Sequence, residues 1–462
     1  MAYWGVAMSN YHQVWPSPPL PEEMEKGAKA VTLAQSMTQQ SKKETDYINA
    51  IAVFYKDWST TDHRSRVLKY YGAMEQLYKI YPGDKEVAIF YALALVGSAD
   101  LADKTYSNQK RAATILQNLY PGQPEHPGIV HYIIHSYDSP ELAALALPAA
   151  RKYASIAPSS AHAQHMPSHI FIRLGLWDES IKSNLIAASS AKCYAEGIGI
   201  KGHWDEELHT IDYLVYSYLQ KGRNDLAKQT VDYLRGFKEV YPVNFKVLYA
   251  FAASPSRYYL ENKLWKEAAD LEFQPGFPWE KYPWQEAIVH FTRLLGAAHT
   301  GKLEATRTAL KELEKKHTAI IAQKDNYKAN QVMIQIETGK AWITFAEGKK
   351  QEAILQMIKA AEMEDKTEKS PVTPGEVLPA RQLLADMMME ANEPAQALTA
   401  YEADLQKHPN RFNSLYGAGL AAERSGNKEK AGRYYLQLAT FANPDSSSRK
   451  EMAAVKNWLK KN

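Results

Sequence analysis

Histidines are concentrated in one part of this chain. Eight of its fourteen histidines lie between residues 126 and 209. They fall into three short segments, in which histidines and acidic residues recur at intervals of three or four positions. Residues at these intervals share one face of an α-helix, so each segment predicts a helix with a polar face. Imidazole and carboxylate groups on such faces are common ligands of divalent transition metals.

The first segment, HPGIVHYIIHSYD, carries His131, His135 and Asp138 at positions i, i+4 and i+7. Pro127 suits the first turn of a helix, so His126 is expected at the N-cap or just before it. Two imidazoles one turn apart can reach one divalent ion at about 2.0–2.1 Å, and Asp138 could add an oxygen or orient an imidazole. The alternative is that both histidines form hydrogen bonds inside a helical hairpin.

The second segment, APSSAHAQHMPSHIFIRLGLW, carries His162, His165 and His169 at i, i+3 and i+7. Pro167 disfavours a helix interior, so the helix either begins near Ala163 or bends at the proline. We expect His169 within the helix, His165 in its first turn and His162 in the preceding loop. The alternative is a bent helix start whose polar residues face water.

The third segment, KGHWDEELHTIDYLVYSYLQ, places Glu206, His209 and Asp212 on one stripe, which Tyr213 and Tyr216 continue. Glu206 or Asp212 could ligate a metal, orient His209 or act as a general base near a metal-bound water. The alternative is an ordinary amphipathic helix with its acidic residues in water. The opposite stripe is apolar and is expected to be core; it comprises Leu208, Ile211, Val215 and Leu219.

The elements that must position these residues are predicted to be helices. Alanine, leucine, glutamate, lysine and tyrosine recur at helical spacing, whereas valine and isoleucine are sparse and do not alternate with polar residues. The clearest unit spans residues 393–439, where Ala397 and Ala431 are 34 positions apart, as are the turn residues Asn392 and Gly426. This unit resembles the tetratricopeptide repeat (TPR), whose small residues let two antiparallel helices approach closely.

Similar turns recur upstream at intervals of 39 to 47 residues, at Gly175, Gly222, Asn262, Gly301 and Gly348. The sequence therefore predicts an all-α fold, a right-handed α-solenoid of antiparallel helical hairpins with irregular repeats of about 34–47 residues. We expect one continuous solenoid. Its parts are N-terminal repeats (1–120), histidine-rich repeats with the metal site (121–240) and C-terminal repeats (241–462).

The beginning of the chain resembles the second helix of a hairpin. Trp4, Val6, Met8 and Trp15 would begin the array without a polar capping helix, which repeat arrays normally have. We therefore expect that a first helix is missing from this chain. The first residues have no basic region followed by an apolar run, so they predict no signal peptide, and a missing N-terminus leaves localisation open.

Charge and cysteine content exclude several classes of protein. The net charge is +3 with no block of five like charges, so the chain lacks the electrostatic pattern of a nucleic-acid binder. No apolar run approaches the roughly 18 residues of a membrane span. Cys193 is the single cysteine, which excludes intrachain disulfides and multi-cysteine metal sites, and we interpret it as a structural or incidental thiol. Phosphate loops, dinucleotide fingerprints, nucleophile elbows and HExxH motifs are absent from the sequence.

Stacked hairpins place corresponding helices on the same concave surface, so the three segments are expected to face one cavity. A site of histidines and carboxylates suits zinc, iron, manganese or copper. The segments offer more donors than a closed tetrahedral site needs, so an open position or a second metal would permit catalysis. The predicted metal ligands are His131, His135, His165, His169, His209 and Asp138. Glu206 and Asp212 are the candidate catalytic residues.

Other residues are expected to line the same cavity. Arg257 follows Pro255 and could bind an anionic ligand group, although pairing with a neighbouring acid is the more common arrangement. Glu286 and His290 are i, i+4 neighbours from a later repeat, and a helix face with one ion-pairing acid is the alternative. Tyr213 completes this candidate ligand-binding set.

The sequence also resembles a known family. HYIIHSYD, HAQHMPSHIFIRLGLW and ELHTIDYLVYSYLQ are similar to the histidine-bearing group of atypical TPR proteins that includes the tetratricopeptide repeat protein 38-like relatives. The similarity extends to MAYWGVAMS and to ALTAYEADLQKHPNRFNSLYGAG, so it covers nearly the whole chain. The resemblance implies a TPR-like fold and one more helix ahead of AYWG. It implies no particular reaction.

Two classes of function follow. The first is a metal-binding solenoid with a histidine and carboxylate site, acting as a metal-dependent enzyme on a small molecule or peptide held in the concave groove. The second is a non-catalytic TPR scaffold that binds a protein or peptide partner in that groove. Geometry discriminates between them, because a metal site requires at least three imidazole nitrogens to converge within about 5 Å.

Overall fold

The structure is a computed structural model that describes residues 1–14, 17–445 and 447–461. Almost all of its regular secondary structure is α-helical, and the helices are joined mostly by short turns. The helical-repeat fold predicted from the sequence is thereby confirmed. Trp15, one of the apolar residues expected near the start of the array, lies outside the described residues. Among the described residues, no helix is long and apolar enough to cross a membrane.

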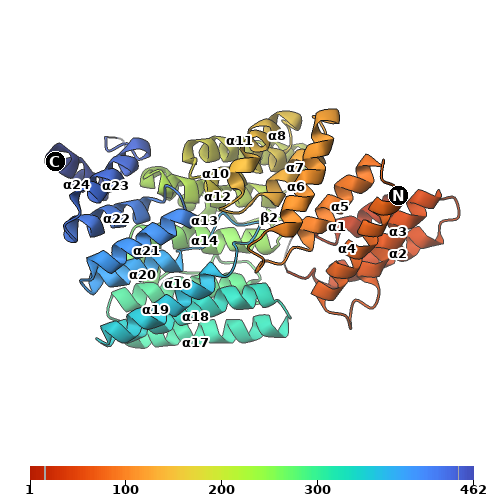
Figure 1. The fold of residues 1–462 in the computed structure, drawn as a ribbon. Coiled ribbons are helices and arrows are strands. Elements are labelled where there is room, and N and C mark those ends of the chain that lie inside the picture. The colour runs from red at the N-terminus through yellow and green to blue at the C-terminus, as the bar shows by residue number, and fades with distance from the viewer. Residues whose placement is uncertain (15–16, 446, 462) are drawn as a thin grey trace. The chain divides into compact units, whose positions relative to one another are not determined.

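The chain forms two compact units, Met1–Asp138 and Ser139–Asn462 (Figure 1). In the first unit each helix packs against the next along the chain. Aromatic rings fill its core, and the rings of Tyr11 and Phe54 lie 3.7 Å apart between centroids. Its helices are α1 (Ala2–Ser9), α2 (Pro21–Ser36), α3 (Lys42–Tyr55), α4 (His63–Ile80), α5 (Lys85–Gly97), α6 (Ser107–Leu119), the 3-10 helix η1 (Tyr120–Gly122) and α7 (Pro127–Ser136).

The second unit is a longer stack of paired helices. The hairpin partners α11 and α12, α16 and α17, α18 and α19, α20 and α21, and α22 and α23 pack extensively against each other. Its elements are α8 (Ala143–Ile156), α9 (Ala161–His165), α10 (Pro167–Arg173), α11 (Trp177–Gly197), β1 (His203–Trp204), α12 (Asp205–Gln220), α13 (Asn224–Arg235), β2 (Val240–Tyr241), α14 (Phe245–Glu261), α15 (Trp265–Ala269), η2 (Trp279–Lys281), α16 (Pro283–His299), α17 (Leu303–Ala322), α18 (Asn326–Ala346), α19 (Lys350–Asp365), α20 (Ala380–Glu390), α21 (Pro394–Lys407), α22 (Phe412–Arg424), α23 (Lys428–Phe441) and α24 (Glu451–Lys461). Strands β1 and β2 pair in parallel.

The turns between hairpin helices share one design. Three residues separate the helices of the pairs α10–α11, α12–α13, α16–α17, α18–α19, α20–α21 and α22–α23, and the middle residue of each turn has a positive φ. Glycine adopts this left-handed conformation without the steric cost that a Cβ atom brings. Each turn position predicted from the sequence lies between two helices. The glycines with positive φ at these turns are Gly175, Gly222, Gly301, Gly348 and Gly426.

Small residues bring the helices of the C-terminal repeat together. Ala397 and Ala431 are fully buried, as their 34-residue spacing predicts. A Cβ atom added to Gly417 would lie 2.3 Å from the ring of Tyr401, so glycine is needed for α21 and α22 to approach this closely. The contact joins neighbouring hairpins, α20–α21 and α22–α23, which stack as TPR repeats do.

The histidine-rich helices begin where the sequence provides a cap. His126 is the N-cap of α7, and its Nδ1 atom accepts a hydrogen bond from the backbone of Ile129 at 3.4 Å, as expected. The second segment bends at Pro167, which is the first residue of α10. The expectation that His162 lies in the preceding loop is wrong. The Ser160 side chain caps α9, so the helix begins at Ala161 and includes His162.

Helix α12 is buried on both faces. Its apolar stripe is core, as predicted, and its polar stripe is also buried because α11 and α14 pack against it. His209, Asp212 and Tyr213 are therefore inside the second unit. The alternative of an amphipathic helix with its acidic residues in water does not hold for Asp212.

Candidate metal centre

Three histidines of the second unit converge. His165 on α9, His169 on α10 and His209 on α12 each offer a ring nitrogen, and these nitrogens lie within 4.8 Å of one another. All three side chains are buried, with at most 6% of the residue exposed. This spread lies inside the limit of about 5 Å set above for a candidate metal site.

His165 and His169 have the spacing of two ligands on one ion. The Nε2 atoms of His165 and His169 lie 3.2 Å apart. Two nitrogens bound tetrahedrally at 2.0–2.1 Å would be about 3.3 Å apart. The His209 ring lies beside His165, with 4.3 Å between centroids. The three nitrogens lie within 4.8 Å of one another, so a shared ion would have to draw the rings closer together.

Asn184 on α11 fixes the orientation of His165. The Asn184 amide nitrogen donates to the backbone oxygen of Ser180 at 2.8 Å, so its Oδ1 atom faces the His165 ring. His165 Nδ1 lies 2.7 Å from that oxygen and must carry the proton. The lone pair of His165 is then on Nε2, toward His169. Metal-binding histidines are commonly oriented in this way through their second nitrogen.

Burial favours the neutral form of His165 and of His209. It lowers the pKa of His165 well below its usual value, and the neighbouring His209 and His169 lower it further. Burial likewise lowers the pKa of His209, although the Glu206 carboxylate opposes this effect. Neutral imidazole is the form that ligates a metal.

Tyr213 on α12 adjoins the three histidines. Its hydroxyl lies 3.3 Å from Nε2 of His169, and its ring is 4.5 Å from the ring of His165 between centroids. The same hydroxyl donates to the backbone oxygen of Val372 at 3.3 Å. Tyr213 therefore connects the histidine cluster with the segment that follows α19.

Glu206 lies at the edge of the cluster as an ionised carboxylate. It pairs with Lys246, and its Oε2 atom lies 3.6 Å from Nδ1 of His162. Burial opposes its ionisation, but Lys246 and His162 hold the pKa of Glu206 well below its usual range. Lys246 also pairs with Asp205 at 2.8 Å. A metal ligand or an electrostatic partner needs this charged form, whereas a general base works best with a pKa near the operating pH.

Asp212 and Arg257 form a fully buried ion pair. Burial raises the pKa of Asp212 to about 6, even though Arg257 lowers it. Arg257 also donates to the backbone oxygen of Gly375 at 2.7 Å. Asp212 and Arg257 thus bind other groups of the protein. Arg257 pairs with a neighbouring acid, which is the alternative to binding an anionic ligand.

The first histidine segment belongs to the other unit. His131 and His135 on α7 are half-buried, with their Nε2 atoms 3.1 Å apart. Their arrangement repeats that of His165 and His169, because both are i, i+4 pairs. Asp138 is the last residue of the first unit. Among the described residues, these three are not part of the converging group.

The later candidates lie on α16 and have other contacts. Glu286 pairs with Lys316 at 2.6 Å. His290 packs against Phe273, and burial together with Arg293 lowers the pKa of His290 to about 4. Cys193 is exposed on α11. The structure does not bring these residues to the histidine cluster.

Residues 366–379, named here the inner segment, connect α19 to α20 and pack against α12, α14 and α18. A pocket of about 40 Å³ that is partly open to solvent remains beside the segment, and it has room for ordered water. Its wall includes Tyr249, Trp284, Tyr327 and Glu376 but no histidine. No repeat spacing or motif in the sequence predicts that this connecting segment is buried.

No family model and no curated protein matches this chain. A human IFIT1 dimer with m7Gppp-AAAA is 14% identical over 91% of this chain and 87% of that chain, with a TM-score of 0.36. A human IFIT1 dimer with PPP-AAAA is 13% identical over 91% and 87%, with a TM-score of 0.39. The TPR domain of P58(IPK) is 13% identical over 82% of this chain and 99% of that domain, with a TM-score of 0.23. These likenesses are to helical-repeat folds and give no information on function.

Proposed function

We propose that this protein binds a divalent transition-metal ion through His165, His169 and His209. The observation that carries the proposal is the convergence of three buried imidazole nitrogens within 4.8 Å. The hydrogen bond from His165 to Asn184 supports it, because that bond leaves the Nε2 lone pair facing the other ligands. The similarity to the histidine-bearing TPR group is consistent with a histidine cluster in this fold.

The chemistry of the donors narrows the choice of metal. Three imidazoles without sulfur suit zinc, copper or iron better than magnesium or calcium, which prefer oxygen. Zinc is the first choice, because three histidines at 2.0–2.1 Å leave one tetrahedral position for water or a substrate. Manganese would need more oxygen ligands, and Glu206 is the nearest ionised carboxylate of the third segment.

An open position would make the site suitable for catalysis on a small molecule or peptide. A bound metal would supply a Lewis acid there. Glu206 would contribute a fixed negative charge beside His209, and Tyr213 a hydroxyl beside His169. Asp212 would stabilise α12 through Arg257 instead of exchanging protons with a substrate. The competing function, a non-catalytic scaffold, requires none of these residues to bind metal.

The test is metal affinity measured by competition with a chromophoric chelator. We expect each protein molecule to bind one zinc ion with high affinity in the second unit. His169→Ala and His209→Ala should each weaken zinc binding by about 100-fold or more, because each removes one of three ligands. His317→Ala on α17 is the matched control and should bind as the wild type does. Equal affinity in all four proteins would refute the proposal.

A further inference from the structure

Two further polar side chains lie about one helical turn from the proposed metal ligands. His162 precedes His165 by three positions on α9, and Glu206 precedes His209 by three positions on α12. Side chains three positions apart lie on the same face of a helix. The rings of His162 and His165 are 6.4 Å apart between centroids. The two helices thus place another imidazole and a carboxylate beside the histidine cluster.

Solvent exposure increases from the histidine cluster toward His162. His165 is fully buried, and only 6% of His209 is exposed. By contrast, 13% of the Glu206 side chain and 44% of the His162 side chain are exposed. An ion that approaches past His162 therefore meets this imidazole and the Glu206 carboxylate before it reaches the buried ligands.

His162 and Glu206 have a spacing that suits two ligands of one ion. Nδ1 of His162 lies 3.6 Å from Oε2 of Glu206, which is longer than a good hydrogen bond. Two ligand atoms bound tetrahedrally at about 2.0–2.2 Å would be about 3.3–3.6 Å apart. Oε1 of Glu206 accepts a hydrogen bond from Lys246, whereas none of the described residues donates one to the buried Oε2 atom. That oxygen can therefore bind an ion without giving up a hydrogen bond to the protein.

The charges around Glu206 favour a cation. Lys246 pairs with both Asp205 and Glu206, so one positive side chain lies between two negative ones. The group is therefore negative overall, and a negative group at an exposed edge attracts divalent ions.

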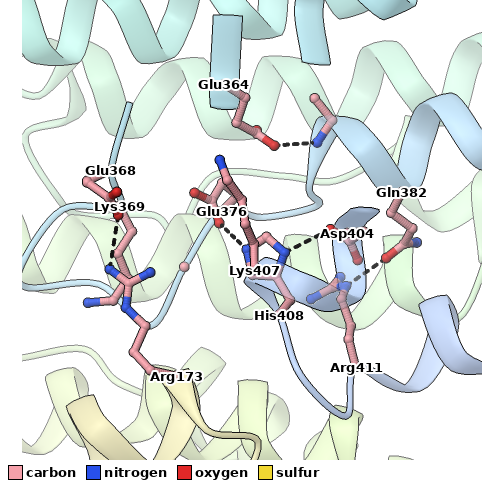
Figure 2. A network of polar contacts seen from close by, with 12 residues as sticks. Arg173, Glu364, Glu368, Lys369, Glu376, Gln382, Asp404, Lys407, His408 and Arg411 are labelled. Carbon is pink, nitrogen blue, oxygen red and sulfur yellow. Dashed lines mark hydrogen bonds and ion pairs between the residues drawn. The ribbon is translucent and has the colours of Figure 1, made fainter. Parts of the chain in front are cut away.

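The buried carboxylates around His408 form a different kind of cluster. Figure 2 shows His408 between Glu376 and Asp404, whose oxygens lie 3.3 and 2.8 Å from its two ring nitrogens. Asp404 also accepts a hydrogen bond from Ser414. Because these groups compensate one another, we interpret this cluster as a structural network.

We propose that His162 and Glu206 form an entry site, which takes up a divalent ion from solvent and passes it to His165, His169 and His209. This inference rests on the proposed metal-binding function. The ion first binds the two protein ligands of the entry site and keeps water at its other positions. It then exchanges these waters for the buried imidazoles, so that each step replaces only part of its coordination shell.

An entry site and a ligand have different effects on the rates of metal binding. The dissociation constant is the ratio of the rate constants for release and association. A residue that only assists passage therefore changes both rate constants by the same factor. Loss of a ligand instead raises the dissociation constant, mainly through faster release.

The experiment mixes metal-free protein with zinc in a stopped-flow instrument and follows free zinc with a fluorescent indicator. His162→Ala should slow both association and release by about tenfold, while the dissociation constant stays within about threefold of the wild-type value. Glu206→Gln should slow association by at least about tenfold, because it removes a ligand and a negative charge. The matched controls are His317→Ala on α17 and the exposed change Glu196→Gln on α11, which should react as the wild type does.

The outcomes distinguish this inference from the proposed function. If the wild type binds zinc tightly but folded His162→Ala associates with zinc at the wild-type rate, the entry site is refuted and the metal centre stands. If His162→Ala instead raises the dissociation constant by about tenfold or more at an unchanged association rate, His162 is a ligand and the entry role is wrong. If the wild type binds no zinc, the proposed function fails and the entry site fails with it. Circular dichroism verifies that each variant is folded.

Discussion

Nδ1 of His165 lies 2.7 Å from Oδ1 of Asn184, on a helix that carries no histidine. The asparagine is itself fixed by its hydrogen bond to Ser180. This contact determines which ring nitrogen of His165 is free to face His169. Asn184, which is not itself a proposed ligand, therefore orients one ligand of the candidate metal centre.

Replacing Asn184 should weaken metal binding without removing a ligand. Asn184→Ala leaves His165 free to rotate and to change tautomer, and such outer partners typically contribute about 10- to 100-fold in metal affinity. Chelator competition measures the effect. Asn224→Ala, at the start of α13, is the control. Unchanged affinity in the Asn184 variant would show that this hydrogen bond has no role in the site.

Metal should stabilise the fold through the histidine cluster. A ligand that binds only the folded state stabilises it by about 2.7 kcal/mol at 100 times its dissociation constant. Thermal unfolding of chelator-treated protein, with and without added zinc, should therefore show an upward shift of the midpoint that His209→Ala abolishes. A shift of equal size in that variant would place the stabilising ion elsewhere.

The buried pair of Asp212 and Arg257 should be structural. Asp212→Asn leaves the Arg257 charge uncompensated in the interior, which typically costs about 3–5 kcal/mol. Urea unfolding measures this loss. Asp232→Asn removes the partner of an exposed lysine and should cost no more than about 1 kcal/mol. Similar losses in both variants would contradict the importance of the buried pair.

His408 should make stability depend on pH above neutrality. Burial disfavours its charged form, but Asp404 and Glu376 overcome this and raise the pKa of His408 to about 9. The value in the unfolded chain is about 6.5. Because the folded pKa is the higher one, the stabilisation is fully present below pH 6.5 and is lost as the pH rises through 9.

Between pH 6.5 and 9, the free energy of unfolding of the wild type should therefore fall by about 3 kcal/mol more than that of His408→Asn. Denaturant unfolding at several pH values measures the difference. Parallel pH profiles of the two proteins would show that His408 is not charged in the folded state.

The sequence predicted much of the fold because repeats leave local signals. Gly222 and Gly301 mark turns through a backbone conformation that favours glycine, and Ala397 and Ala431 mark the close contacts between helices. These are properties of single positions and short intervals. The division after Asp138 was not predicted, because it depends on how many contacts cross a boundary and not on composition.

The candidate site was predicted in part. His165 and His169 follow from their i, i+4 spacing, and the repeat pattern gave the reason to add His209 from another helix. Asn184 left no signal, because a single asparagine at a distance of 19 residues has no characteristic spacing. The inner segment was also missed, because its prolines indicate a surface connection and burial depends on partners far away in sequence.

The most direct test of the metal centre is X-ray absorption spectroscopy of the purified protein loaded with one equivalent of zinc. We expect the zinc ion to be coordinated by three imidazole nitrogens at about 2.0–2.1 Å and by a fourth light atom. His169→Ala should lose one of these nitrogens. A shell of oxygens without imidazole scattering, or a spectrum that His169→Ala leaves unchanged, would contradict the assignment of His165, His169 and His209 as ligands.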